Sequence, residues 1–189
     1  MKTTKTTLEP DICVISAPFG RLEVATELVD GSLMVSQIAY LPQSRSLISP
    51  GNALALEVER QCKAYFSDPG AAFDLPLKPQ GTAYQRRVWD AIAQLRPGQR
   101  VSYGEIAKRI RSGPRAVGSA CGANYFPLVI PCHRVVAKTS MGGFMKQNTP
   151  GLFRDIKSWL LEHEARAESG DLRERKTAAS ENPSGPQVA

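Results

Sequence analysis

Histidine is scarce in this sequence, and clusters of metal ligands are missing. The only two histidines are His133 and His163. The four cysteines lie far apart and form no C-x-x-C pair; they are Cys13, Cys62, Cys121 and Cys132. Because a structural zinc site takes closely spaced Cys and His ligands, we expect no metal site. Scattered thiols are also typical of a reduced protein rather than of a disulfide framework.

Long apolar runs are missing as well, and we expect no secretory leader. No stretch approaches the roughly 18 apolar residues that a membrane-spanning helix needs, and the first residues, MKTTKTTLEPD, contain no apolar core of a signal peptide. We therefore expect a cytoplasmic protein without a membrane partner. The chain has no internal repeats, and its 189 residues suit one domain or two small domains that share a core.

Positive charge is concentrated in the middle of the chain. Residues 81–164 carry 13 Lys or Arg and 5 Asp or Glu, whereas residues 1–80 carry 7 and 9. A basic region of this kind fits a polyanionic partner such as nucleic acid. It fits a solvated basic face equally well, and charge alone leaves both interpretations open.

Residues 1–79 predict a small strand-rich domain. Three β-rich runs, at residues 12–17, 21–29 and 32–41, are separated by turn signals. Asp30-Gly31 between the last two runs indicates a hairpin. A helix with a mostly apolar face is expected over residues 52–66. With the helices of the second half, the fold class is α/β (α+β).

Residues 80–165 predict a mostly helical domain. Helices are expected over residues 83–95, with Thr82 as N-cap, and over residues 103–110, 114–123 and 152–165. Ser102 and Glu105 form a capping box at the start of the second helix. The second and third helices, joined by a turn with Gly113, make a helix-turn-helix. Residues 166–189 hold almost no bulky apolar side chains and are expected to be a disordered tail.

The third of these helices is made almost entirely of small residues. After Arg115, the small residues of this helix are Ala116, Gly118, Ser119, Ala120, Gly122 and Ala123. A helix this narrow can pack tightly on a neighbouring helix. Alternatively it approaches DNA closely, with Arg115 as the one long side chain available to enter the duplex. The residues alone support both interpretations.

The stretch LVIPCHRVV, at residues 128–136, has the apolar character of a buried strand and places Cys132 directly before His133. A buried cysteine is by default a small apolar side chain, and we interpret the other three cysteines in that way. Cys132 differs because a base and several cations lie near it in the sequence, and the thiolate is the nucleophilic form of a thiol.

On a strand, the side chains of Cys132 and His133 would not contact each other directly, because neighbouring residues face opposite sides. A bridging water or a bend at Pro131 would connect them. A third group should then orient the histidine, and Glu162 and Glu164 are the candidates. The pattern indicates a thiol nucleophile.

The run Pro131-Cys132-His133-Arg134-Val135 resembles the active-site motif of the O6-alkylguanine-DNA alkyltransferases, also called methylated-DNA–protein-cysteine methyltransferases. GTAYQRRVW, VSYGEIA, RAVG, Asn124 and WLLEHE also occur in that family's order. The resemblance covers residues 80–164 strongly, and the first part is similar to the family's more variable N-terminal domain. It implies DNA repair by irreversible, single-turnover transfer of an alkyl group from O6-alkylguanine to Cys132, with O4-alkylthymine as a second candidate substrate.

The resemblance also implies roles for particular residues. His133 would deprotonate Cys132 through a water, and Glu164 would hold the histidine. Tyr103 would donate a proton toward the leaving guanine, and Asn124 would tie the helix-turn-helix to the active-site segment. The base would be flipped from the minor groove, with DNA contacts from Arg115, Ala116, Gly118, Ser119, Gly122 and Tyr103. The implied partner is double-stranded DNA with O6-alkylguanine, bound by a monomer without any cofactor, at the nucleoid in a bacterium.

One region departs from the family pattern. Only five residues, AKTSM, separate Val136 from Gly142, and Ser140 and Met141 stand where many members have a tyrosine and a serine. The following span, residues 144–151, is longer than in those members. Phe144 and Met145 are therefore our candidates for apolar contacts with the base.

Two other classes of protein compete with this interpretation. A helix-turn-helix regulator, or a protein that flags DNA damage without removing it, would use the basic region but not the thiol. A cysteine hydrolase would use the thiol and turn over, with His163 as its base.

Overall fold

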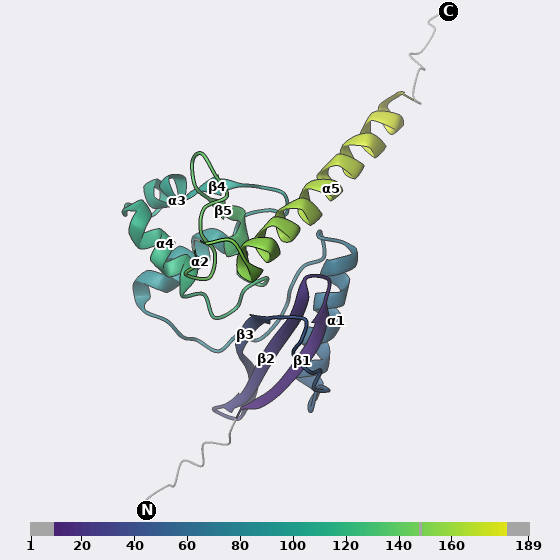
Figure 1. Cartoon of the computed structure of the whole chain (residues 1–189), viewed down its shortest axis with the longest axis vertical. Coiled ribbons are helices and arrows are strands. Elements are labelled where there is room, and N and C mark those ends of the chain that lie inside the picture. The colour runs from purple at the N-terminus through teal and green to yellow at the C-terminus, as the bar shows by residue number, and fades with distance from the viewer. Residues whose placement is uncertain (1–9, 148, 181–189) are drawn as a thin grey trace, which may run out of the picture.

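The computed structural model describes residues 10–147 and 149–180. A three-stranded sheet and helix α1 form one end of the molecule, and a group of short helices forms the other (Figure 1). The last helix, α5, begins between these two parts and projects beyond them. This arrangement is the expected α+β fold.

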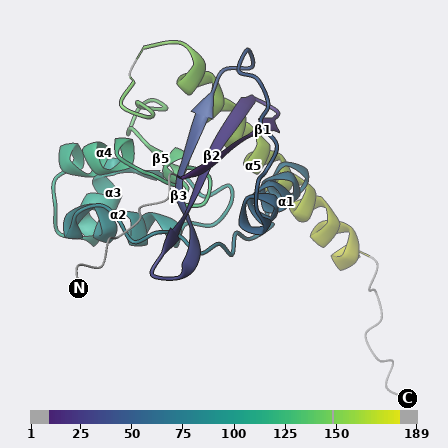
Figure 2. The same ribbon diagram turned by 90° about the horizontal axis from the view of Figure 1, so that it is seen from below.

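The sheet is antiparallel, with strand order β1-β2-β3 (β1, Asp11–Ala17; β2, Gly20–Val29; β3, Ser32–Leu41). Asp30 and Gly31 join β2 to β3 with φ angles of 48° and 82°, the left-handed pair that a two-residue hairpin turn requires. Helix α1 (Ala53–Ser67) packs on the sheet, as the view in Figure 2 shows, and Asn52 caps its start by accepting from the Ala55 amide. The predicted strands and helix are confirmed.

The second part contains the predicted helix-turn-helix, formed by α3 (Tyr103–Arg109) and α4 (Pro114–Gly122). Helix α2 (Ala83–Ala93) packs against both. Two very short strands, β4 (Val101–Ser102) and β5 (Val135–Val136), pair in parallel. The predicted capping box of α3 is present, because Ser102 and Glu105 exchange both hydrogen bonds.

The segment expected to be a buried strand is not one. Leu128 has a φ of 75°, the Cys132 amide donates back to the Ile130 carbonyl, and Cys132–Arg134 form a 3-10 helix, η1. Pro131 explains part of the difference, because proline cannot donate to a strand ladder. Only Val135–Val136 is extended and paired, so the strand prediction is wrong for the segment that carries the cysteine.

The expected disorder from residue 166 also differs from the structure, in which α5 runs over Leu152–Ser180. Residues 166–180 are rich in Ala, Glu, Arg and Lys, which are good helix formers even without an apolar stripe. The prediction is therefore wrong up to Ser180, and residues 181–189 lie outside the described residues.

The two halves share one hydrophobic core, and against it pack Phe19 and Trp159 of α5, whose ring centroids lie 5.3 Å apart. The amide of Ile38 in β3 also donates to the Tyr125 carbonyl at 2.8 Å. The predicted domain boundary between residues 79 and 80 stays a prediction. The strand-rich first half packs directly against the segments that carry the site.

Candidate active site

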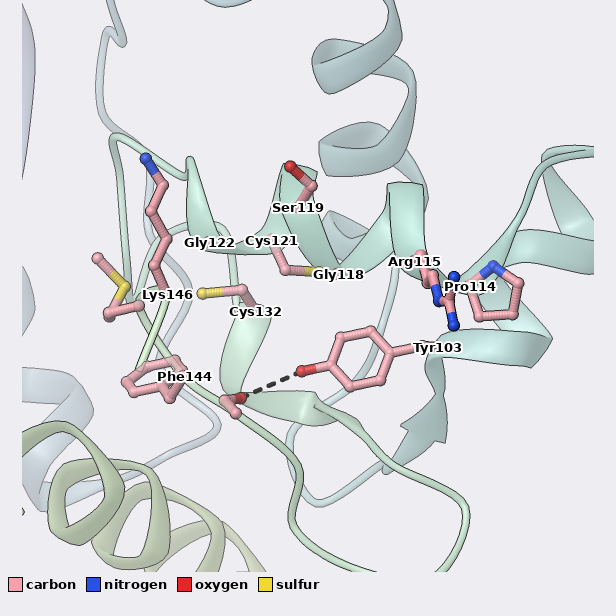
Figure 3. Close-up of a pocket in the computed structure, with 12 residues that line it drawn as sticks. Tyr103, Pro114, Arg115, Gly118, Ser119, Cys121, Gly122, Cys132, Phe144 and Lys146 are labelled. Atoms are coloured by element: carbon pink, nitrogen blue, oxygen red, sulfur yellow. Dashed lines mark hydrogen bonds between the residues drawn. The ribbon is translucent and has the colours of Figure 1, made fainter. Parts of the chain in front are cut away.

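A cavity of about 460 Å³ opens beside α4, with Cys132 among its lining residues. Figure 3 shows the sulfur of Cys132 and the hydroxyl of Tyr103 beneath α4. The other lining residues come from α4 and from the loop that precedes α5: Pro114, Arg115, Gly118, Ser119, Cys121, Gly122, Gly143, Phe144, Met145 and Lys146. Of the predicted DNA-contact residues, Ala116 alone lies outside this lining, although it is exposed.

Helix α4 has two different faces. Val117, Ala120 and Cys121 are buried, and the Trp89 indole of α2 donates to the Ala120 carbonyl at 2.9 Å. The opposite face, with Arg115 and Ser119, is exposed along the cavity. The two interpretations of the small residues are thus compatible, because one face packs on a helix and the other is open.

Asn124 connects the end of α4 to the cysteine segment. Its amide nitrogen donates to the Ile130 carbonyl at 2.8 Å and to the Sγ atom of Cys132 at 3.3 Å. Its side-chain oxygen accepts from the Phe126 amide at 2.9 Å. The side chain is buried and bonded at both ends, so it fixes the thiol relative to the helix-turn-helix.

The thiol of Cys132 is 2% exposed. Burial raises its pKa, and the Asn124 hydrogen bond, the charge of Lys157 and nearby backbone amides oppose that rise without cancelling it. The resting group is therefore a neutral thiol at physiological pH, and a base must remove its proton before it can act as a nucleophile.

His133 is fully buried, and its Nε2 atom lies 2.8 Å from the Oε1 atom of Glu164. Burial lowers the pKa of His133 more than Glu164 raises it, so the ring is neutral and donates from Nε2 to the carboxylate. The other nitrogen, Nδ1, is then the proton acceptor. It has no hydrogen-bond partner within the described residues.

Glu164 is a fully buried carboxylate at the centre of a hydrogen-bond network. Burial alone would raise its pKa, but hydrogen bonds from His133 and Arg134 and the charge of Arg134 lower it well below its usual value. Arg134 donates from Nη2 at 2.8 Å and from Nε at 3.0 Å, while Tyr65 and the Gly98 amide donate at 2.8 and 3.0 Å. Glu162, the other candidate, is exposed and accepts from Ser158.

Sequence reasoning assigned no role to Lys157, which is fully buried beside the cavity. Its Nζ atom donates to the carbonyls of Val135 at 2.7 Å and Gly143 at 3.1 Å. Burial lowers its pKa to about 8, and a thiolate at Cys132 would raise it. The sequence did contain one signal for Lys157. It lies seven residues before Glu164, and this spacing places both side chains on the same face of a helix.

Tyr103 lines the cavity and is held there by the Gly143 carbonyl, which also accepts from Lys157. Its hydroxyl donates to Gly143 at 3.1 Å (Figure 3), and the Lys157 ammonium lies 5.9 Å from its ring centre. Burial raises the pKa of Tyr103, so the hydroxyl stays protonated and is able to donate.

His163 is positioned away from this chemistry. Its ring stacks on Trp159 with centroids 4.7 Å apart, and its Nε2 atom bonds to the Tyr65 carbonyl. It is not among the cavity-lining residues, so the structure gives no support to a hydrolase with His163 as base. In the described part of the chain, no three His, Cys, Asp or Glu side chains cluster as metal ligands, and no helix there is long and apolar enough to span a membrane.

Comparison with known proteins places this geometry in a family. A profile described as 6-O-methylguanine DNA methyltransferase, DNA binding domain, matches residues 83–166. The Methanosarcina mazei methylated-DNA–protein-cysteine methyltransferase is 43% identical over 110 residues, which cover 57% of this chain and 66%, just under two thirds, of that protein. Mycobacterium tuberculosis O6-methylguanine methyltransferase is 31% identical, with a TM-score of 0.68 over 84% of this chain and 94% of the solved chain. The chain belongs to the O6-methylguanine-DNA methyltransferase family.

A second solved structure of a family member contains DNA. Mycobacterium tuberculosis OGT in complex with DNA is 34% identical to this chain, with a TM-score of 0.63. The match covers 82% of this chain and 92% of that one, so it includes both halves of the fold.

In the present methyltransferase-family chain, a tight turn forms part of the cavity lining. The backbones of Phe144 and Gln147 exchange two hydrogen bonds, of 2.9 and 2.8 Å, and Met145 and Lys146 between them have φ angles of 49° and 63°. Gly122 permits the turn to approach α4, because a Cβ atom there would lie 2.8 Å from the Cγ atom of Lys146. Phe144 and Met145, our candidates for apolar contacts, both line the cavity.

Proposed function

We propose that this protein repairs DNA by transferring an alkyl group from O6 of guanine to the Sγ atom of Cys132. The observation that carries this proposal is a single constellation. A buried thiol, held by Asn124 and adjacent in the chain to the His133–Glu164 pair, opens into a cavity under an exposed, narrow helix. The family of the chain supports the same reaction.

The groups of the site suit an in-line displacement. His133 accepts the thiol proton at Nδ1 through a bridging water, and Glu164 stabilises the imidazolium that forms. The thiolate attacks the alkyl carbon, the bond from that carbon to O6 breaks, and its electron pair passes to the guanine. Tyr103 supplies the proton that the leaving guanine takes up. The thioether is stable, so each molecule reacts once.

Double-stranded DNA is the partner that fits the surface of the cavity. The O6 position is buried in the duplex, so the base must be flipped out to reach Cys132. The minor groove is only about 6 Å wide, and the Gly and Ser residues on the open face of α4 suit it. Arg115, at the start of α4 and in the cavity lining, would fill the gap that the flipped base leaves in the stack. All these groups come from one chain, so we propose that the protein acts as a monomer. We also propose that it acts in the cytoplasm, at the nucleoid if the organism is a bacterium.

One incubation tests the proposed reaction. The protein is mixed with a duplex that contains a single O6-methylguanine, and its intact mass is measured before and after. We expect the mass to rise by one methyl group in stoichiometric amount, with unmodified guanine left in the DNA. The same duplex with guanine at that position is the control. Binding without a gain in mass, or repair of many duplexes by one molecule, would contradict the proposal.

Arg115→Ala should slow repair of duplex DNA while reaction with free O6-benzylguanine stays fast. Only the duplex requires extrusion, and unstacking a base costs a few kcal/mol. We expect a loss of about 10- to 100-fold on the duplex, because each 1.36 kcal/mol changes a rate about tenfold. The measurement is the single-turnover rate on both substrates.

Arg154→Ala is the matched control for Arg115, because it removes the same charge from an exposed position outside the cavity lining. It should leave the ratio of the two rates unchanged. Equal slowing of Arg115→Ala on both substrates would show that Arg115 acts in the chemistry or in folding instead.

A further inference from the structure

Tyr65 brings a residue of the strand-rich half into the hydrogen-bond network of the active site. It lies in α1 and is 1% exposed. Its hydroxyl donates to the Oε1 atom of Glu164 at 2.8 Å, and its own backbone carbonyl is bonded to His163 of α5. Two contacts therefore tie α1 to the helix that carries Glu164.

The Oε1 atom of Glu164 is shared between competing donors. The Tyr65 hydroxyl, the Nε2 atom of His133 and the Nη2 atom of Arg134 each lie 2.8 Å from it, and the Nε atom of Arg134 also donates to it at 3.1 Å. A carboxylate oxygen offers about two lone-pair sites, so four hydrogen bonds from these three residues divide its negative charge. The strength of the hydrogen bond between Oε1 and His133 therefore depends on how strongly Tyr65 and Arg134 bind the same oxygen.

We propose that Tyr65 is a positioning residue that sets how strongly His133 holds a proton, by drawing charge from the carboxylate oxygen that the two share. The inference rests on the proposed function, in which His133 is the base for Cys132. A base with too high a proton affinity would be protonated before it could act, and the Tyr65 hydroxyl lowers that affinity.

The charged groups around His133 give the sign of the effect. Glu164 of α5 raises the pKa of His133, whereas burial, Arg134 of η1 and Lys157 of α5 lower it. Without the Tyr65 hydroxyl, Oε1 would accept three hydrogen bonds instead of four, from His133 and Arg134 only, and would hold the imidazolium more tightly. The pKa of His133 should therefore rise, and the acid limb of the transfer reaction should move to higher pH.

Tyr65→Phe isolates the hydroxyl because the ring is fixed by other contacts. Its centroid lies 6.0 Å from that of Phe66 and 5.5 Å from those of Phe73 and His163. Phenylalanine keeps the ring that makes these contacts. Tyr84→Phe is the matched control, since it removes a tyrosine hydroxyl that is bonded to Ser112 at 2.8 Å, outside the Glu164 network.

The chain has only two histidines, so nitrogen NMR of histidine-labelled full-length protein can follow His133 directly, with His163 as an internal reference. We expect Tyr65→Phe to raise the midpoint of His133 by about one pH unit, the size expected for one hydrogen bond to a charged group. Tyr84→Phe should leave it unchanged. A midpoint that is unchanged or lowered in Tyr65→Phe, or a His133 that stays neutral throughout in both proteins, would overturn the inference.

The pH profile of reaction with free O6-benzylguanine separates the two proposals. Tyr65→Phe should shift the acid limb upward by the same amount as the NMR midpoint, and its rate above that limb should match the wild-type rate. The proposed function would be contradicted if the wild-type protein gained neither a benzyl group from this probe nor a methyl group from duplex DNA. A wild type that reacts, beside a Tyr65→Phe profile that does not shift, would overturn only the role of Tyr65.

Discussion

Replacing Cys132 with serine is expected to abolish alkyl transfer and to leave binding to alkylated DNA intact. Serine nearly preserves the size of the side chain, but its hydroxyl is a far weaker nucleophile without the activation that a dedicated site provides. Intact mass after incubation with an O6-methylguanine duplex should show no added methyl group, and a titration with the same duplex should give the wild-type affinity.

The other cysteines provide the controls for this prediction. Burial raises the pKa of Cys13 to about 11 and that of Cys62 to about 12, and both lie outside the cavity lining. Cys13→Ala and Cys62→Ala should therefore still accept one methyl group. Cys121 does line the cavity, so peptide mapping of the modified wild type is the decisive measurement. A methyl group found on any cysteine except Cys132 would refute the assignment.

Glu164→Gln is expected to destabilise the fold and to slow transfer together. It leaves the buried Arg134 without its counter-charge, and breaking a buried ion pair in this way costs about 3–5 kcal/mol. It also replaces the charged acceptor that orients His133 with a neutral amide oxygen, which stabilises the imidazolium less. Urea unfolding measures the first effect, and the rate with free O6-benzylguanine measures the second.

Glu162→Gln is the matched control, because Glu162 lies on the same helix but is exposed. Its effect on the free energy of unfolding should stay within about 0.5 kcal/mol. The pKa of Glu164 is lowered in the folded state, so its contribution is present above the unfolded pKa of about 4.3 and is lost as the pH falls toward the folded value. Equal stability of the two variants at pH 7 would show that the Glu164 network does not hold the fold together.

Local structure was determined by the sequence itself, since its signals act within a few residues. Asp30-Gly31 predicted the hairpin because both positions require left-handed backbone, and Ser102 with Glu105 predicted the start of α3 through two reciprocal hydrogen bonds. The motif around Cys132 likewise predicted the family. These features need no knowledge of how distant segments meet.

The tertiary structure alone decided how the active site is assembled. The strand predicted for residues 128–136 is replaced by a turn and the 3-10 helix that carries Cys132, in a segment held by Asn124 and packed against α2 and α5. Tyr65 reaches the site only because α1 packs beside α5, whereas the seven-residue spacing of Lys157 from Glu164 was already visible in the sequence. Hydrogen bonds between residues so far apart in the chain carry no period or spacing in the sequence. They form only when burial leaves each polar group no other partner, which is a property of the whole packed core.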